Sequence, residues 1–197
     1  MTNKPSNLII NTSLPGKSVP RRRFLQLLAY SSISAVGFPD VAKAAINRDF
    51  KPRKLSFAHT HTGENLSVTY FEDGQYLVDA MQEINNLLRD HRTGDVHSID
   101  PALLNQLHLI HSKLGSNKPF QIISGYRSPF TNALLQKRSR GVAKKSLHML
   151  GKAIDVRIEG VDSKNIKKAA IAMGQGGVGY YQRSNFVHLD TGRFRTW

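Results

Sequence analysis

The chain has 197 residues, of which 40% are hydrophobic and 21% are charged, and this composition is typical of a folded globular domain. The formal net charge of +14 suits a polyanionic partner, either nucleic acid or a cell wall rich in carboxylates, and charge alone does not choose between them. The absence of cysteine excludes disulfides, thiolate metal sites and a cysteine nucleophile. Any metal ion must therefore be held by His, Asp or Glu side chains.

Residues 1–44 have the pattern of an export signal and carry +5 of the net charge, which leaves +9 on residues 45–197. A basic run (Arg-Arg-Arg-Phe-Leu) precedes a short apolar stretch and a small-residue cleavage site, Val-Ala-Lys-Ala. The pattern resembles a twin-arginine signal, although Pro20 and Gln26 replace its usual Ser and Lys, so Sec export stays open. We expect the twin-arginine machinery as a partner, cleavage after about Ala44, and a periplasmic protein with no membrane span after processing. The alternative is an ordinary helix preceded by a basic tail.

The next part of the chain predicts a hairpin and two helices. Alternating strand-like segments at 54–58 and 66–71 flank a Thr-Gly-Glu-Asn turn. Hydrophobic residues at helical spacing predict a helix over 76–90. A second helix is expected over 101–114, capped by Asp100.

Short strands and helices alternate in the rest of the chain. The predicted elements are a strand over 120–123, a helix over 130–138, a loop over 139–151, a strand over 153–158, a helix from Asp162 or Ser163 to about Met173, and strands over 178–181 and 186–190. This order predicts an α+β fold with helices packed on a small, mainly antiparallel sheet. Residues 45–197 are expected to form one domain.

A set of polar side chains lies on two of these strands and in the loop before one of them. Because side chains alternate between the faces of a strand, His188 shares a face with Asp190, and Asp155 lies on the polar face of its own strand. If the strands are neighbours, both faces line one cleft. His148 lies in the preceding loop, which Gly151 allows to bend toward Asp155.

Two imidazoles and one carboxylate make a three-ligand set for zinc, so we expect His148, Asp155 and His188 to hold Zn²⁺ with a fourth position open for water. Zinc lowers the pKa of bound water toward roughly 7. Hydrolysis at such a centre needs a base for the water and a donor for the oxyanion. Asp190 is the candidate base and Arg127 the candidate donor.

Three motifs resemble a known family. Ser146-x-His148-x6-Asp155 with a later His matches the D-Ala-D-Ala metallopeptidase superfamily, which shares its zinc core with hedgehog-type domains. Ser-Gly-Tyr-Arg-Ser at 124–128 looks like the substrate-side Arg motif of that superfamily. Over about residues 53–197 the chain is similar to the murein endopeptidase K family, through Leu-His-Met-x-Gly-x-Ala-Ile-Asp, Gly-Gly-Val-Gly-Tyr-Tyr and Phe-Val-His-Leu-Asp-Thr-Gly-Arg.

The resemblance implies a zinc peptidase domain over 45–197, a hedgehog-like α+β fold, periplasmic peptidoglycan as the partner, and endopeptidase activity on its peptide cross-links. Many members of the superfamily place an acid three residues before the last zinc His, where this chain has Asn185. By inference the base role moves to Asp190. Ser146 is expected to orient His148, and Tyr126 to contact substrate or support the site.

Other functions and other residues stay open at this point. The same site could trim terminal D-Ala as a carboxypeptidase, or a degenerate site could merely bind peptidoglycan. Nucleic acid is the weaker partner, because the export signal argues against it. His59 and His61 could share a face near the hairpin, but we expect both to be solvated. Tyr180 and Tyr181 could belong to the core or to a groove wall, and the sequence does not decide.

Overall fold

An eight-stranded sheet is the framework of the protein in the part of the chain that the computed structural model describes, residues 51–139 and 141–197. The predicted export signal lies outside these residues. The strands are β1 (Arg53–His59), β2 (Asn65–Glu72), β3 (Gln75–Tyr76), β4 (Phe120–Ser124), β5 (Ala153–Ile158), β6 (Gly177–Tyr181), β7 (Phe186–Asp190) and β8 (Arg195–Thr196). Their spatial order is β3-β2-β1-β4-β5-β7-β6-β8. Only β1–β4 and β6–β8 are parallel pairs, which confirms the mainly antiparallel α+β fold.

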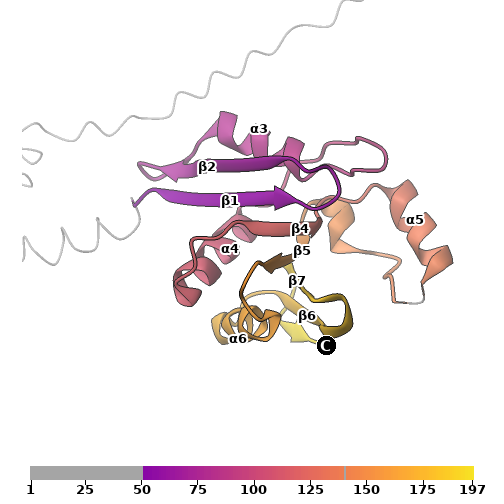
Figure 1. Ribbon diagram of the computed structural model, residues 1–197. Helices are drawn as coiled ribbons and strands as arrows, with labels where there is room; N and C mark the ends of the chain where they lie inside the picture. The colour runs from indigo at the N-terminus through magenta and orange to yellow at the C-terminus, as the bar shows by residue number, and fades with distance from the viewer. Residues whose placement is uncertain (1–50, 140) are drawn as a thin grey trace, which may run out of the picture. The chain divides into compact units, whose positions relative to one another are not determined.

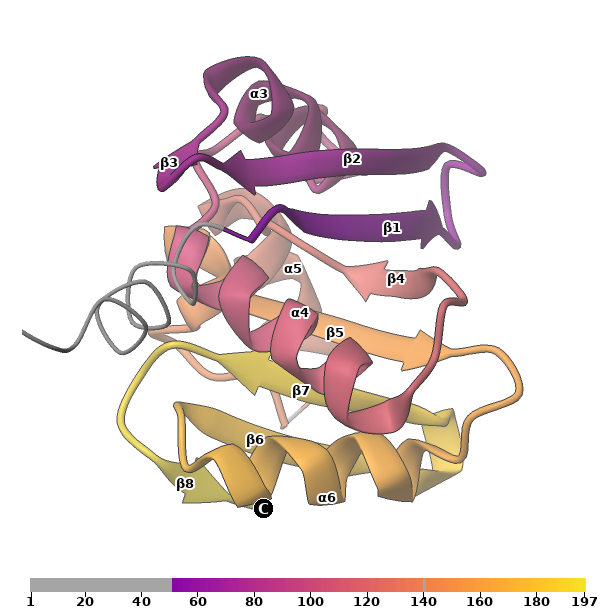
Figure 2. The same cartoon turned by 90° about the vertical axis from the view of Figure 1, so that its left-hand side faces the viewer.

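The longer helices lie on both sides of this sheet (Figures 1 and 2). They are α3 (Val78–Leu87), α4 (Pro101–Leu114), α5 (Pro129–Arg138) and α6 (Ser163–Met173). Helices α4 and α6 pack together over one face, whereas α5 lies on the opposite side with the loop that follows it. None of the described helices is long and apolar enough to cross a membrane.

The hydrophobic core fills the space between the sheet and the α4–α6 layer. Strand residues that point to this side are fully buried, including Ile154 and Val156 on β5 and Val187 and Leu189 on β7. The alternation of a strand then directs the intervening residues to the α5 side. The two central strands therefore combine an apolar face with a polar one, and the polar face carries the candidate site.

The starts of three helices follow local sequence rules. Asp100, Ser128 and Asp162 precede α4, α5 and α6, and each side chain accepts a hydrogen bond from a backbone N–H of the first turn. Proline follows two of these caps, where its missing N–H costs nothing. Capping of this kind explains why these helix starts were predictable to within a residue.

Three short elements differ from the predictions. The helix expected over 76–90 is shorter at both ends. It begins at Val78, because Gln75 and Tyr76 extend the sheet by pairing with the end of β2, and it ends at Leu87. The loop expected over 139–151 contains a 3-10 turn, η1 (Leu147–Leu150). Strand β8 was not predicted, since two residues are too few to show alternation.

Candidate metal centre

Strands β5 and β7 bring two of the predicted ligands directly opposite each other. The strands are antiparallel neighbours, and Asp155 pairs with His188 in their register. Paired residues of adjacent strands share a face, so both side chains point to the α5 side of the sheet. The predicted neighbourhood of the two strands is thereby confirmed.

His148 reaches the same place from η1, and two glycines, Gly151 and Gly125, make its position possible. Gly151 ends the turn with φ of 64°, and a Cβ there would lie 2.1 Å from the carbonyl oxygen of Ser98. Gly125 packs against the backbone of Leu88, where a Cβ would lie 2.5 Å from the carbonyl oxygen. Its own carbonyl accepts a hydrogen bond from Nδ1 of His148 at 2.8 Å. The bend predicted at Gly151 therefore exists, and it fixes the direction of the imidazole.

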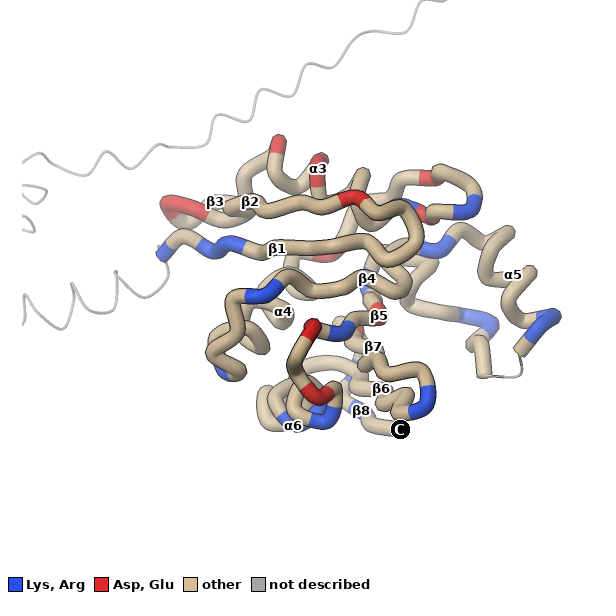
Figure 3. Tube along the Cα trace, in the orientation of Figure 1, with Lys and Arg blue, Asp and Glu red and all other residues tan. Residues whose placement is uncertain are grey.

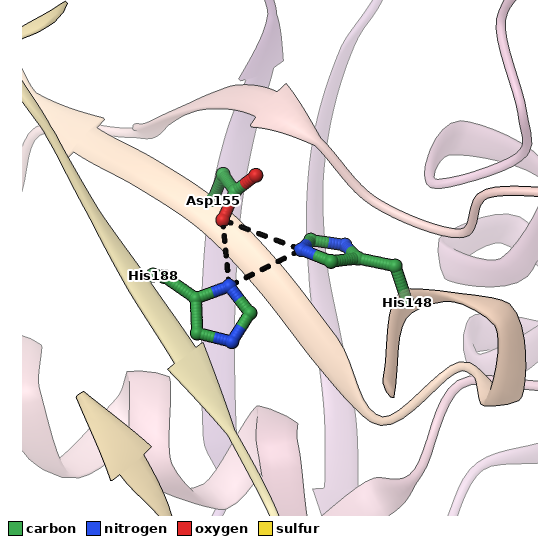
Figure 4. Close-up of side chains that lie close together, drawn as sticks. All are labelled: His148, Asp155 and His188. Carbon is green, nitrogen blue, oxygen red and sulfur yellow. Dashed lines mark hydrogen bonds and ion pairs between the residues drawn. The ribbon is translucent and has the colours of Figure 1, made fainter. Parts of the chain in front are cut away.

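The three candidate ligands converge on one point (Figure 4). One ligand atom from each of His148, Asp155 and His188 lies within 4.8 Å of the other two, and all three residues are buried. Oδ1 of Asp155 is 2.8 Å from Nδ1 of His188 and 3.3 Å from Nε2 of His148. The two facing imidazole nitrogens are 3.2 Å apart.

Each ligand histidine has an inner nitrogen, which faces the centre, and an outer nitrogen, which points away from it. The hydrogen bond of the outer nitrogen determines whether the inner one carries a proton or a lone pair. Nδ1 of His148 donates to a carbonyl, and Nε2 of His188 donates to Oδ2 of Asp190 at 3.0 Å. A neutral imidazole that donates through one nitrogen has only a lone pair on the other. Together with the Asp155 carboxylate, three acceptors therefore face one another, and they require a cation or a proton between them. This donor set fits a metal ion such as zinc.

The pKa values within the centre agree with this requirement. Burial alone would raise the pKa of Asp155, but the neighbouring imidazoles of His148 and His188 hold it well below its usual range. Burial lowers the pKa of His188, whereas its hydrogen bonds to Asp155 and Asp190 raise it to about 9. At neutral pH a proton thus occupies the centre unless a metal ion displaces it.

Asp190 lies behind His188, away from the open side of the centre. It is fully buried, and its oxygens accept hydrogen bonds from the backbone of Gly177 and Gly192 and from the guanidinium of Arg195. Burial raises the pKa of Asp190, but the bonds from His188 and Arg195 outweigh burial and keep it ionised. A base must reach the attacking water, and this carboxylate does not line the pocket. The contact with His188 supports a role for Asp190 in orienting that ring, and its role as the base stays a prediction.

Of the other predicted site residues, Arg127 and Ser146 line the pocket, whereas Tyr126 does not. Arg127 lines the pocket, with Nη2 3.6 Å from Oδ2 of Asp155 and 3.2 Å from Oγ of Ser124. Ser146 also lines the pocket, but the bond that orients His148 comes from the Gly125 carbonyl instead. Tyr126 stacks on the ring of His97 and does not reach the pocket. Of these residues, the structure brings only the first two to the centre.

The pocket over the centre has a volume of about 420 Å³ and an aromatic wall, which includes Tyr181, one of the two tyrosines that the sequence left undecided. Tyr181, Phe186 and Trp197 line it beside His188. The signal that could have indicated Tyr181 is its position two residues after Gly179, on the face of β6 that adjoins His188. No local pattern indicates Trp197, because its place depends on the pairing of β8 with β6.

Exposed cations gather near the pocket, on the end of α5 and the loop that follows it (Figure 3). They are Lys137, Arg138, Lys144 and Lys145, and Lys145 lines the pocket itself. Such a basic rim attracts polyanions at long range. Its location ties part of the net positive charge to the candidate site.

Comparison with known proteins gives concordant matches. A family model described as peptidoglycan L,D-endopeptidase MepK matches residues 47–197. The peptidoglycan L,D-endopeptidase MepK of Escherichia coli (strain K12) is 46% identical over 176 residues, which is 89% of this chain and 96% of that protein. The probable peptidoglycan L,D-endopeptidase MepK of Haemophilus influenzae is 45% identical over 148 residues, which is 75% of this chain and 80% of that protein.

Proposed function

Because this chain belongs to the family described as peptidoglycan L,D-endopeptidase MepK, we propose that it is a metal-dependent endopeptidase that hydrolyses L,D peptide cross-links of peptidoglycan. The observation that supports the proposal best is the convergence of His148, Asp155 and His188 beneath an open pocket. A cation held there has three protein ligands and an open side, which is the arrangement of catalytic rather than structural zinc sites.

The proposed metal ion is zinc, held by Nε2 of His148, a carboxylate oxygen of Asp155 and Nδ1 of His188. When bound, it supplies an activated water near neutral pH and polarises the scissile carbonyl. With a metal ion bound, the remaining proton of His148 would lie on Nδ1, toward the carbonyl of Gly125, and that of His188 on Nε2, toward Asp190. Both contacts hold the ligands in the tautomers that bind metal.

Arg127 is proposed to stabilise negative charge that develops on the substrate. Its side chain is largely buried at the pocket wall and lies beside the Asp155 carboxylate. Burial lowers the pKa of Arg127 while Asp155 raises it, and a guanidinium stays charged under all working conditions. A fixed cation in a half-enclosed site lowers the energy of an oxyanion more than it would in water.

Zinc, export and processing extend the proposal beyond the family match. The twin-arginine pattern before residue 27 and the small residues up to Ala44 support export to the periplasm, where peptidoglycan lies. The first residue of the protein recovered from the periplasm tests the cleavage site. A chain that keeps its first 44 residues there would contradict processing at Ala44.

The function is tested by digestion of purified cross-linked muropeptide dimers with the zinc-loaded protein. We expect L,D-linked dimers to fall as monomers rise, and a chelator to stop the reaction until zinc is restored. D,D-linked dimers serve as the matched control for the type of cross-link. Release of terminal D-Ala alone would instead show a carboxypeptidase, and binding without any cleavage would show a non-catalytic domain.

A further inference from the structure

Strand β6 places an aromatic residue next to the candidate centre. It pairs with β7 so that Gly179 lies opposite His188, and Tyr181 lies opposite Phe186. All four positions share the face of the sheet that carries the ligands. Because Gly179 has no side chain, the space directly beside the His188 imidazole is left for another group.

The indole of Trp197 occupies that space. A Cβ on Gly179 would lie 2.6 Å from Cε2 and 2.8 Å from Nε1 of the indole, so only glycine permits this packing. The indole and imidazole centroids of Trp197 and His188 are 5.3 Å apart. The backbone of Trp197 is held to β6 by hydrogen bonds with Val178 and Tyr180.

The indole in turn fixes the Tyr181 hydroxyl. Nε1 of Trp197 donates a hydrogen bond to Oη of Tyr181 at 3.0 Å, and the phenol ring stacks on Phe186 with centroids 4.5 Å apart. Since an indole N–H is only a donor, the phenol oxygen must accept, and its own proton is left for another partner. The hydrogen bonds of the described residues give that proton no acceptor.

The position of Trp197 holds the Tyr181 hydroxyl toward β7, the strand of His188. Nε1 lies beside Gly179, so its bond to Tyr181 keeps the hydroxyl near the centre, on the pocket wall. Arg195 secures this arrangement, because its guanidinium lies 4.9 Å over the indole while it binds Asp190. Arg195 therefore contacts both Asp190, the partner of His188, and Trp197, the partner of Tyr181.

On this geometry, and resting on the proposed function, we propose that Tyr181 donates a hydrogen bond to the oxyanion of the scissile amide, and that Trp197 is the residue that positions it. During hydrolysis a water oxygen bonds to the carbonyl carbon and the carbonyl oxygen gains negative charge. The C–N bond then breaks, both protons of the attacking water end on the leaving nitrogen, and the products are a carboxylate and a protonated amine. Tyr181 keeps its own proton throughout and contributes only the hydrogen bond.

Tyr181 complements Arg127 instead of duplicating it. The guanidinium of Arg127 already contacts Ser124 and Asp155, whereas the phenol proton is uncommitted. Both residues line the same pocket. A neutral donor also leaves the charge balance of the ligands unchanged, so its effect falls on the transition state rather than on metal binding.

The test compares Tyr181→Phe with Tyr180→Phe in the zinc-loaded protein, using L,D-linked muropeptide dimers. Tyr180 is the neighbouring residue on the opposite face of β6, where it contacts Lys167, so its variant makes the same chemical change away from the pocket. We expect Tyr181→Phe to lower kcat about 100-fold, as the loss of an oxyanion donor does, with KM and zinc content unchanged. Tyr180→Phe should behave as the wild type.

The positioning role of Trp197 has its own variants. Trp197→Phe keeps an aromatic ring but loses the N–H, and we expect kcat to fall about three- to tenfold, the equivalent of one neutral hydrogen bond. Gly179→Ala should displace the indole and lower kcat in the same way, again without loss of zinc. Unchanged kcat in both variants would contradict the role of Trp197.

The outcomes separate this inference from the proposed function. A wild-type protein that leaves the dimers uncut overturns the proposed function and this inference with it. An active wild type with an equally active Tyr181→Phe variant overturns the inference alone. So does a Tyr181→Phe variant whose loss appears only in KM or in zinc content, because it shows a role in packing.

Discussion

Two groups of histidines lie at different places in this fold, and only one of them is arranged to hold a metal. His59, His61 and His91 cluster where the β1–β2 hairpin meets the loop after α3, with the rings of His61 and His91 stacked at 4.2 Å. The other group comprises His148 and His188 with Asp155. Histidine content is therefore a poor guide to metal binding.

The difference lies in the second nitrogen of each ring. Nδ1 of His59 accepts hydrogen bonds from the backbone N–H groups of His61 and Thr62, both at 3.2 Å. Its proton must then be on Nε2, so neither nitrogen offers a lone pair to a metal. In His148, Nδ1 instead donates to the carbonyl of Gly125, so the lone pair is on Nε2 and faces the centre. The partner of the outer nitrogen decides between a structural and a metal-binding histidine.

Charge separates the groups as well. Two acids lie near the first group. Glu64 is exposed and pairs with Arg89 at 3.0 Å, and the buried Asp90 accepts hydrogen bonds from the backbone N–H groups of Arg92 and Ser128. Burial lowers the pKa of His91 to about 4, so this ring stays neutral at physiological pH. In the second group Asp155 is buried among the imidazoles and raises the pKa of His188. Only the second group is built to accept positive charge.

The largest expected effect contrasts one histidine from each group. His148→Ala should reduce bound zinc from about one ion per chain to almost none and lower cleavage of L,D-linked dimers at least about 1,000-fold, because the activated water is lost. His61→Ala, at an exposed position, should retain both zinc and activity. Metal analysis and dimer cleavage measured on the same samples check both variants. A zinc-loaded His148→Ala protein would refute the proposed ligand set.

Asp190→Asn tests whether the partner of the outer nitrogen of His188, Nε2, controls metal binding. If Asp190 orients that ring, the variant should bind zinc about 10- to 100-fold more weakly and regain turnover in excess zinc. If it is the base, turnover should stay lost even when zinc is saturating. Zinc titration followed by kcat determination distinguishes the two roles.

The pH dependence should also differ between the groups. Zinc must displace the proton whose pKa Asp155 and Asp190 raise to about 9 on His188, so zinc affinity should fall roughly tenfold per pH unit between pH 8 and 6. In the protein stripped of zinc, a lower pH should instead increase the free energy of unfolding. The protonated ring adds its full stability below its ordinary pKa of 6.5, and this contribution is lost as the pH rises through about 9. Competition with a chelator and melting at pH 6 and 9 measure the two effects.

The smallest effect on function is expected in the first group. His59→Leu removes the acceptor for two backbone N–H groups and should cost about 1–3 kcal/mol of unfolding free energy, with zinc content and kcat unchanged. His59→Asn, whose side-chain oxygen can accept the same bonds, should recover part of that stability. Denaturant unfolding gives the stability, and a loss of zinc from either variant would break the distinction between the groups.

His59 also shows a limit of prediction from sequence. It was expected to be solvated with His61, but it is 3% exposed, whereas His61 is exposed as expected. Alternation along β1 puts His59 on the buried face with Phe57 and Leu55, and the loop after α3 covers its end. The strand pattern was visible in the sequence, but the covering loop was not.

Most of the regular elements could be read from the sequence, because their signals are local. Asp100 and Ser128 cap helices within two or three residues of themselves, and β5 and β7 alternate over five or six residues. The ligand trio was also indicated by a spaced motif together with a later histidine. Such features depend on short-range chemistry, and they survive without knowledge of the neighbours.

The sequence by itself determined the residue types of the centre, the strands that carry two of them and the glycine that turns the third inward. Only the tertiary structure decided which partner each outer nitrogen meets, that Asp190 lies behind a ligand, and that Trp197 fills the space beside Gly179. The physical reason is that these contacts join residues far apart in the chain. A hydrogen bond acts only over about 3 Å, so its partner depends on strand order and packing, which no local pattern encodes.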